Sequence, residues 1–346
     1  MKKKISIHDI ARHCNVSSTT VSFVLNNKAG ENKIRKEVAD KILDYVKEVN
    51  YTPNHVAKSL RTGKTRIIGM LVEGISDPFF AAIAKGIEHR AYKLGYKIFF
   101  ASTDNDTNKA KDLIKVFRER QVDAYIIAPP PGIEDDIRSL IEDETPVILF
   151  DRYYPSVNTN NIIVNNYDGS YQAIRYLQQN KYVNIGFVTL ESSQSQMEDR
   201  MKGYLDAIKG NNQTSYVLKV PYSLTDPDIL NHIKDFLNKN SVLDAVLFGT
   251  NYLASNGLEA INALQIKVPE DIAVISFDDS PIFRLISPTI TAVAQPIENI
   301  AEAVIKRLMT CLYDPIANSK TETIVLETEF IIRNSSAKKT KKRLVV

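Results

Sequence analysis

The sequence has no tryptophan, only two cysteines, and no apolar run that approaches the roughly 20 residues of a membrane-spanning helix. The basic N-terminus, Met1 to Lys4, is followed by polar residues instead of an apolar segment, so we expect no export signal. Cys14 and Cys311 lie far apart and match no metal-binding or redox spacing. These shortages predict a soluble cytoplasmic protein with reduced thiols.

Signatures of catalysis are missing as well. The sequence contains no G-x-G-x-x-G or G-x-x-x-x-G-K-[ST] phosphate loop and no G-x-S-x-G nucleophile turn. Its five histidines show no metal-ligand spacing. We therefore expect a protein that is not an enzyme and that binds neither a cofactor nor a metal ion.

What is present is an ordinary globular composition, with 44% hydrophobic and 25% charged residues over 346 positions, enough for two or three domains. The net charge of +3 is unevenly distributed. Residues 1–65 and 335–346 are strongly basic, whereas the long middle segment is acidic. A basic end on an acidic body favours contact with a polyanion, although the charge alone fits a solvated surface equally well.

The N-terminal segment predicts two short helices joined by a tight turn. Residues 7–14 have helical apolar spacing and stop at Asn15, which tolerates a left-handed backbone. Ser17 is a good N-cap for a second helix over residues 18–25. This pattern indicates a helix-turn-helix, with an ordinary helical hairpin as the alternative.

A third helix is expected to begin near Asn32, as its N-cap, and to run to about Asn50. Its predicted inward residues are Ile34, Val38, Ile42, Tyr45 and Val49.

The second helix carries the side chains that we expect to read DNA. Hydroxyls and amides can bond phosphates or base edges, and an apolar group such as Phe23 can contact a thymine methyl. The predicted DNA-contacting residues in and around the first two helices are Ser6, Ser17, Ser18, Thr19, Thr20, Ser22, Phe23 and Asn26.

Several short segments carry a family resemblance. They are Ile7-His8-Asp9-Ile10-Ala11, Val16-Ser17, Thr20-Val21-Ser22, Val24-Leu25-Asn26, Tyr51-Thr52-Pro53-Asn54 and Ala57-Lys58-Ser59-Leu60. In these segments the chain resembles the LacI/GalR family of bacterial repressors. Phe23 departs from the family pattern, because a basic or imidazole residue is more usual there. The operator sequence therefore cannot be copied from relatives.

The resemblance implies a hinge helix after the Pro53-Asn54 turn, which orders on operator DNA and enters the minor groove in pairs. By this resemblance Leu60 is a wedge that unstacks a base step, and Ala57 permits close approach of the two helices. The alternative for Leu60 is a core residue at the domain junction. The further DNA-contacting residues that the resemblance implies are Tyr51, Asn54, His55, Ala57, Lys58 and Leu60.

From residue 67 onward, apolar strands alternate with helical stretches, which predicts parallel sheets covered by helices on both faces. The first predicted strands are residues 67–72, 97–101, 124–128 and 147–150, with helices such as 79–94 and 109–120 between them. The second series is residues 184–189, 217–220, 245–249 and 272–277. The predicted fold class is α/β, a two-lobed periplasmic-binding-protein-like body of two doubly wound parallel-sheet subdomains behind an N-terminal all-α helix-turn-helix domain.

The family fold supplies the expected domain boundaries. The DNA-binding domain covers residues 1–52, and the hinge helix and linker cover residues 53–65. The body covers 66–334, with an N-subdomain of about 66–164 and 292–325 and a C-subdomain of about 165–291 and 326–334. Residues 335–346 are expected to form a disordered basic tail.

Open parallel sheets bind ligands beyond the carboxyl ends of their strands, so polar residues that follow strands are the candidate site. By resemblance Arg200 clamps the ligand and Asp278 accepts its hydroxyl or amine groups. The alternatives are core packing for Phe79 and Phe80, a helix N-cap for Asp278, and a structural salt bridge for Arg200. The predicted ligand-binding residues are Asp77, Phe79, Phe80, Asp151, Arg152, Gln194, Gln196, Arg200, Tyr222, Asn251 and Asp278.

One arginine with several acids, amides and aromatic rings suits a sugar or sugar derivative. We therefore expect an allosteric transcription regulator, a repressor, controlled by a small-molecule effector. One short reading helix covers few bases, so we expect a homodimer, or a tetramer of two dimers, on a pseudo-palindromic operator. Family analogy places the dimer interface on the helices at 79–94 and 109–120. Two alternatives are a small-molecule-binding protein of the transport class and a sugar-processing enzyme with an accessory DNA domain.

Overall fold

The structure is a computed structural model that describes residues 5–51 and 63–337, and it divides into two units, residues 1–65 and 66–346. The expected hinge residues Asn54, His55, Ala57, Lys58 and Leu60 lie outside the described residues. So does the basic segment after residue 337.

The described part of the N-terminal unit contains the helices α1 (Ile7–Cys14), α2 (Ser18–Leu25) and α3 (Lys36–Glu48), and the predicted bounds of the first two are confirmed. A capping box between Ser6 and Asp9 starts α1, and Asn15 ends it with φ 60°. Ile10, Val21, Val24 and Ile42 form the buried centre of this unit. The unit therefore has its own small core.

The start of α3 differs from the prediction. Arg35 is the N-cap residue and makes no side-chain capping bond. Asn32 does not cap the helix, because its Nδ2 donates to the carbonyl oxygen of Lys28 at 2.9 Å in the preceding turn. Val49 follows the last residue of α3 and is half-buried.

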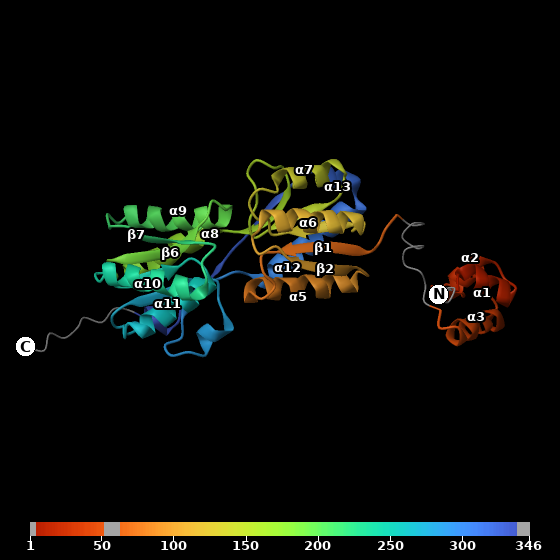
Figure 1. The fold of residues 1–346 in the computed structure, drawn as a ribbon, viewed down its shortest axis with the longest axis horizontal. Helices are drawn as coiled ribbons and strands as arrows, with labels where there is room; N and C mark the ends of the chain where they lie inside the picture. Colours follow the sequence, from red (N-terminus) through yellow and green to blue (C-terminus); the bar gives the residue numbers. More distant parts are fainter. Residues whose placement is uncertain (1–4, 52–62, 338–346) are drawn as a thin grey trace, which may run out of the picture. The chain divides into compact units, whose positions relative to one another are not determined.

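The first lobe of the second unit is a parallel six-stranded sheet between two helical layers (Figure 1). Its strands, in spatial order, are β11 (Thr323–Leu326), β5 (Asn160–Val164), β4 (Val147–Phe150), β3 (Ala124–Ile127), β1 (Ile67–Val72) and β2 (Lys97–Ser102). On one face pack α5 (Pro78–Lys93) and α12 (Ile297–Tyr313), and on the other α6 (Thr107–Glu119) and α7 (Glu134–Glu142). The short helix α13 (Pro315–Ser319) follows α12.

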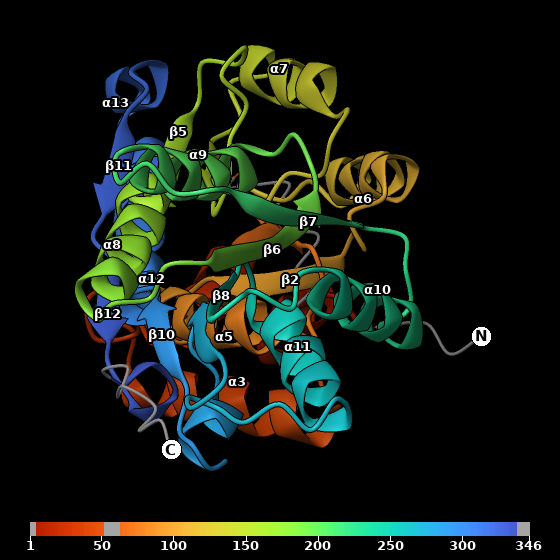
Figure 2. The same cartoon turned by 90° about the vertical axis from the view of Figure 1, so that its left-hand side faces the viewer.

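The second lobe repeats this plan with one antiparallel edge strand. Its strands, in spatial order, are β12 (Glu329–Ile331), β10 (Thr291–Ala294), β9 (Ala273–Phe277), β8 (Ala245–Phe248), β6 (Ile185–Glu191) and β7 (Tyr216–Pro221). Helices α8 (Asn166–Gln179) and α9 (Ser195–Lys209) cover one face, and α10 (Asp226–Lys239) and α11 (Asn251–Ala263) the other (Figure 2). The predicted two-lobed α/β fold is confirmed.

The predicted middle crossover between lobes is misplaced. The expected boundary near Thr291 assigned residues 292–294 to the first lobe. Instead, β10 pairs in parallel with β9, with Thr291 opposite Ile275 and Val293 opposite Phe277. The chain leaves the second lobe only after Ala294, because β10 extends that sheet between β9 and β12.

The predicted start of the disordered tail, at residue 335, is too early in the chain. Ser335 and Ser336 are fully buried against the second lobe. Ser335 Oγ donates to the carbonyl oxygen of Val274 at 2.6 Å, and Ser336 Oγ lies 2.6 Å from Thr291 Oγ1. These bonds fix the chain up to the end of the described region. Within residues 5–51 and 63–337, no helix is long and apolar enough to cross a membrane.

Candidate functional site

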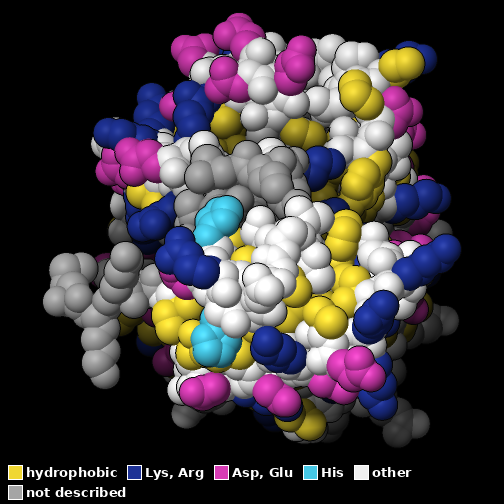
Figure 3. Space-filling model, turned by 90° about the vertical axis from the view of Figure 1, so that its right-hand side faces the viewer, with side chains coloured by type: hydrophobic (Ala, Val, Ile, Leu, Met, Phe, Trp, Pro, Cys, Tyr) yellow, Lys and Arg dark blue, Asp and Glu magenta, His cyan; other side chains and the backbone are white. Residues whose placement is uncertain are grey.

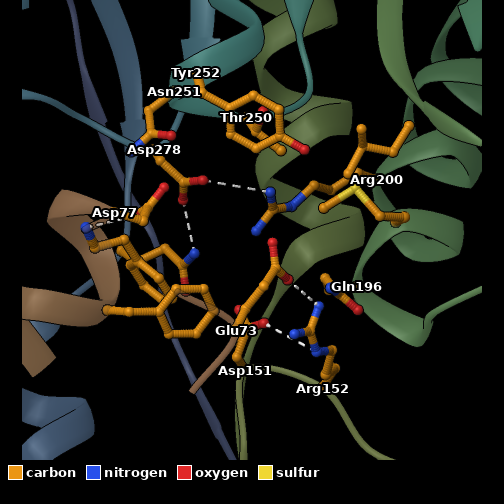
Figure 4. A pocket seen from close by; sticks show the side chains of 15 residues that line it. Glu73, Asp77, Asp151, Arg152, Gln196, Arg200, Thr250, Asn251, Tyr252 and Asp278 are labelled. Carbon is orange, nitrogen blue, oxygen red and sulfur yellow. Dashed lines mark hydrogen bonds and ion pairs between the residues drawn. The ribbon is translucent and has the colours of Figure 1, made fainter. Parts of the chain in front are cut away.

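A cavity lies where the carboxyl ends of strands from both lobes meet, and its empty space amounts to about 410 Å³, including the part open to solvent. Polar residues reach it from positions directly after β1, β4, β9 and β10, and from Thr250 and Asn251 shortly after β8. The lining residues are Glu73, Asp77, Phe79, Phe80, Asp151, Arg152, Leu190, Gln196, Met197, Arg200, Thr250, Asn251, Tyr252, Asp278 and Gln295 (Figure 4).

Arg200, on α9, is a buried cation of the cavity and is 1% exposed. Its Nε donates to Asn166 Oδ1 at 2.8 Å, and its Nη1 donates to the carbonyl oxygen of Gly249 at 2.7 Å. The guanidinium carbon lies 3.7 Å from the ring centre of Phe277. These contacts fix its orientation, so a ligand meets a preorganised cation.

Asp278 lies directly after β9 and faces Arg200, with Oδ2 3.5 Å from Arg200 Nη1. Its Oδ1 accepts a hydrogen bond of 2.7 Å from Gln295 Nε2. The alternative of a helix N-cap does not hold, because Ser280 is the N-cap of the following 3₁₀ helix. The alternative of a structural salt bridge for Arg200 holds in part, because the pair also lines the cavity.

Arg152 is the second buried cation, at 3% exposure. Its Nη1 lies 2.7 Å from Glu73 Oε2, and its Nε lies 3.8 Å from Asp151 Oδ2. Nε and Nη2 have no hydrogen-bond partner within the described part of the chain. Buried donors of this kind normally find a partner, and a ligand that carries acceptors can supply it.

Two carboxyl groups in the cavity hold their protons more tightly than usual. Burial raises the pKa of Asp151 to about 6, although Arg152 and Arg200 oppose this shift. Burial also raises the pKa of Asp77, and the charges of Asp278 and Glu73 add to the effect. Ionised Asp77 and Asp151 are therefore costly in this cavity unless a cation or hydrogen-bond donor comes close.

Phe79 and Phe80 serve the core and the cavity together. They lie at the start of α5, which Asp77 caps by accepting a 2.7 Å hydrogen bond from the backbone N–H of Phe79. Their ring centres are 5.0 Å apart in an edge-on arrangement, and Phe80 packs edge-on against Phe150. The core alternative is correct for both, yet both also line the cavity.

Two predicted ligand residues lie beside the cavity instead of on its wall. Gln194 accepts a 3.1 Å hydrogen bond from Arg152 and lines a neighbouring groove. Tyr222 lines an adjoining groove and donates to Glu73 Oε1 at 2.5 Å. The cavity residues that the sequence prediction left out are Glu73, Leu190, Met197, Thr250, Tyr252 and Gln295. Glu73 and Gln295 directly follow strands, which is the signal that could have identified them.

Among the described residues, no cluster of histidine, cysteine and acidic side chains could hold a metal ion.

The candidate DNA-reading surface is formed by α2. Thr19 and Asn26 are exposed, and Ser18, Ser22 and Phe23 are half-buried. Helix α2 has no charged side chain of its own, and the face drawn in Figure 3 carries Lys and Arg side chains, together with some Asp and Glu, among uncharged surface. This pairing suits a phosphate-flanked groove.

Some predicted DNA contacts already have structural tasks. Ser6 caps α1, and Ser17 caps α2 by accepting from the backbone N–H of Thr20 at 3.0 Å. Asn26 Nδ2 donates to the carbonyl oxygen of Ser22 at 2.7 Å. Tyr51 packs against the three-helix core. The hydrogen bonds of Ser6, Ser17 and Asn26 are local and exposed, so these three side chains can exchange them for contacts with DNA.

The comparisons with known proteins match both units. The family model of bacterial regulatory proteins of the lacI family matches residues 6–54, and a periplasmic binding protein-like domain matches residues 174–336. The NTD biosynthesis operon regulator NtdR of Bacillus subtilis (strain 168) is 29% identical over 335 residues, which cover 96% of this chain and 99% of that protein.

Two solved structures extend the likeness. A periplasmic binding protein/LacI transcriptional regulator from Alkaliphilus metalliredigens QYMF, complexed with D-xylulofuranose, is 26% identical, with a TM-score of 0.68 over 78% of this chain and 98% of that chain. The lac repressor dimer bound to operator and an anti-inducer is 20% identical, with a TM-score of 0.84 over 96% of this chain and 99% of that chain, and shows the shared fold. Residues 6–54 therefore match the lacI family of bacterial regulatory proteins, and the chain shares the fold of the lac repressor dimer.

Proposed function

We propose that this chain is a sequence-specific DNA-binding transcription regulator, a repressor, whose affinity for its operator is controlled by a small molecule in the cavity between the lobes. The molecule is a sugar or a sugar derivative. The DNA-reading residues are on α2, and the effector residues are those that line the cavity.

The observation that carries this proposal is the shared construction of the cavity. The first lobe supplies Asp151 and Arg152, and the second lobe supplies Arg200 and Asp278. A ligand that bonds to both pairs favours one relative position of the lobes over others. The ligand controls DNA binding if the favoured arrangement of the lobes binds DNA with a different affinity from the other arrangements. A ligand shifts such an equilibrium only through its different affinity for the two states.

A sugar fits the chemistry of the wall. Carboxylates accept from ligand hydroxyls, guanidiniums donate to ring and hydroxyl oxygens, and the rings of Phe79 and Phe80 offer apolar faces. The relative that is complexed with D-xylulofuranose supports this class of ligand.

We further propose that the regulator acts as a homodimer on a pseudo-palindromic operator. Helix α2 has 8 residues and can contact only a few base pairs in one major groove. Two copies related by a two-fold axis read two half-sites, which lengthens the recognised sequence.

The experiment is selection of a binding site from a random duplex library, followed by fluorescence anisotropy titration with the full chain. We expect the selected duplex to bind at least about a thousandfold more tightly than random DNA. We also expect the affinity to fall steeply as salt is raised. Equal affinity for selected and random DNA would contradict sequence-specific regulation.

A matched pair of variants locates the reading surface. Thr19→Ala removes an exposed hydroxyl from α2. We expect it to weaken binding to the selected duplex by about tenfold, the effect of one lost base or phosphate contact. Thr310→Ala removes a similarly exposed hydroxyl from α12 and is expected to leave DNA binding unchanged. Equal effects of the two changes would remove α2 from the reading role.

A further inference from the structure

The cavity has more acidic than basic side chains. Its wall contains the four carboxyl groups of Glu73, Asp77, Asp151 and Asp278, with Arg152 and Arg200 as the cations and no lysine or histidine. Each arginine already has a close carboxylate, because Arg152 lies 2.7 Å from Glu73 and Arg200 lies 3.5 Å from Asp278. Two negative charges therefore remain without a cation of their own in this wall.

Asp77 is the one of these four carboxylates without an ion pair among the described residues. It caps α5 through the backbone N–H of Phe79. Asp278 and Glu73 are near enough for their charges to raise its pKa further. A neutral ligand leaves this repulsion in place, whereas a cationic ligand removes it.

Two buried acceptors in the same wall also have no partner. Gln295 donates its Nε2 to Asp278, which leaves Gln295 Oε1 as an acceptor, and that atom is buried without a hydrogen bond. Gln196 Oε1 is likewise buried and unbonded. Both side chains are less than one tenth exposed. Buried acceptors without donors indicate that the missing partner carries N–H or O–H groups.

Three acceptor side chains lie together around Asp278 in the cavity wall. Asp77 lies beside Asp278 on one side of the cavity, and Gln295 is bonded to Asp278 (Figure 4). An ammonium has three N–H donors and no acceptor, so it can bond to all three side chains at once. The nearby Phe79 ring can add a cation–π contact.

The groove that adjoins the cavity has the same sign of charge. Its lining includes Glu73, Asp77, Asp104 and Asp226 and no basic side chain. Asp104 is ion-paired with Lys109 at 2.5 Å, but Lys109 does not line the groove. An acidic approach concentrates cationic solutes and disfavours phosphorylated or carboxylated ones.

We propose that the effector is a sugar bearing a protonated amine, and that this amine binds among Asp77, Asp278 and Gln295. This inference rests on the proposed function and names the ligand class of the same cavity. Arg200 and Arg152 then bind hydroxyl or ring oxygens of the sugar, and the amine supplies the charge that the wall lacks.

The test compares matched pairs of sugars on the full-length protein at about pH 6.5. The probes are D-glucose and D-ribose, their analogues with one hydroxyl replaced by an amine at each ring or exocyclic position, and the N-acetyl forms of those amines. Thermal shift ranks the panel, and isothermal titration calorimetry measures Kd for the best pair. We expect at least one amine to bind about tenfold or more tightly than both its hydroxyl and its N-acetyl partner, the effect of one charge-assisted hydrogen bond.

Asp77→Asn identifies the group that binds the amine. Asparagine caps helices as well as aspartate does, so α5 keeps its start while the charge is lost. We expect this variant to bind the amine and its hydroxyl partner with equal affinity, so that the preference for the amine is lost. Asp106→Asn is the control, since Asp106 caps α6 in the same way, through the N–H of Lys109, away from the cavity.

Three outcomes overturn the proposal. They are a panel in which no amine exceeds its neutral partner, a preference that survives in Asp77→Asn, or an equal loss in Asp106→Asn. These results are distinguishable from failure of the proposed function. If a neutral sugar binds the cavity at least as tightly as every amine and changes operator affinity, the proposed function holds and the amine proposal is wrong. If an amine binds the cavity without any effect on operator affinity, the amine proposal holds and the proposed function is wrong.

Discussion

Asp151 links the stability of the protein to pH in a way that can be measured. Its pKa is about 6 in the folded protein, against an ordinary value of 3.8, because burial disfavours the charged form. The folded state therefore binds this proton more tightly than the unfolded chain, and the free energy of unfolding falls as pH rises from about 4 to about 6. At about 1.36 kcal/mol for each pKa unit, ionised Asp151 destabilises the fold by about 3 kcal/mol at neutral pH.

Asp151→Asn removes this penalty while keeping the shape of the side chain. The free energy of unfolding of the variant, relative to wild type, is expected to increase by about 2 kcal/mol between about pH 4 and pH 7. Urea denaturation of both proteins at several pH values measures the difference. Asp135→Asn is the control, since the side chain of Asp135 is 96% exposed.

A difference between Asp151→Asn and wild type that does not change with pH would contradict the raised pKa, because Asp151 would then have an ordinary pKa in the folded protein. A difference of the opposite sign, with wild type gaining stability as pH rises, would mean that Arg152 and Arg200 outweigh burial.

Three further changes test other parts of the structure. Arg200→Ala is expected to destabilise the body by about 3–5 kcal/mol in urea denaturation, because it leaves buried Asp278 without its cation, and Asp278→Asn in the same chain is expected to restore part of the loss. Arg200→Ala is also expected to abolish the effect of the effector on DNA binding. A normal effect would mean that the effector binds elsewhere. Gly203→Ala places a Cβ 2.3 Å from a backbone oxygen of α8 and is expected to cost about 1–3 kcal/mol, whereas Gly74→Ala meets only ordinary contacts and serves as the control. Leu60→Ala is expected to weaken operator binding and reduce bending of the duplex, measured by gel shift with circularly permuted fragments, and unchanged bending would remove Leu60 from the wedge role.

The local elements were predictable because short-range chemistry determines them. Ser17 and Asn15 mark helix ends by capping and by a left-handed backbone, and the bounds of α1 and α2 follow from them. Strands β1 and β4 are apolar runs buried on both faces, and their predicted bounds agree with the structure. These signals come from the residues themselves and need no partner elsewhere in the chain.

Features set by distant partners were harder to predict. Residues 291–294 have the composition of a strand in either sheet, and only pairing with β9 assigns them to the second lobe. Ser335 and Ser336 look like the start of a polar tail, and they are fixed by Val274 and Thr291. Asn32 looks like a cap, but a carbonyl four residues earlier takes its amide.

The cavity residues also divide into those that the local sequence predicts and those that depend on contacts with distant residues. Residues after the central strands, such as Asp151 and Asp278, could be predicted because parallel strands end at one edge of the sheet. Gln295 was missed because no strand is predicted over residues 291–294, where the prediction places a crossover between the lobes. Gln194 and Tyr222 follow the right strands, but they contact Arg152 and Glu73 from neighbouring grooves.

In the proposed function, the occupant of the cavity sets the affinity of the protein for DNA. The direct measurement is the Kd of the full-length protein for its selected duplex, by fluorescence anisotropy, with and without a saturating compound that binds the cavity. We expect this Kd to change by at least about fivefold, with the same factor for the compound when DNA is bound, because coupling is reciprocal. A compound whose binding requires Arg200 but leaves the duplex Kd unchanged would contradict the account.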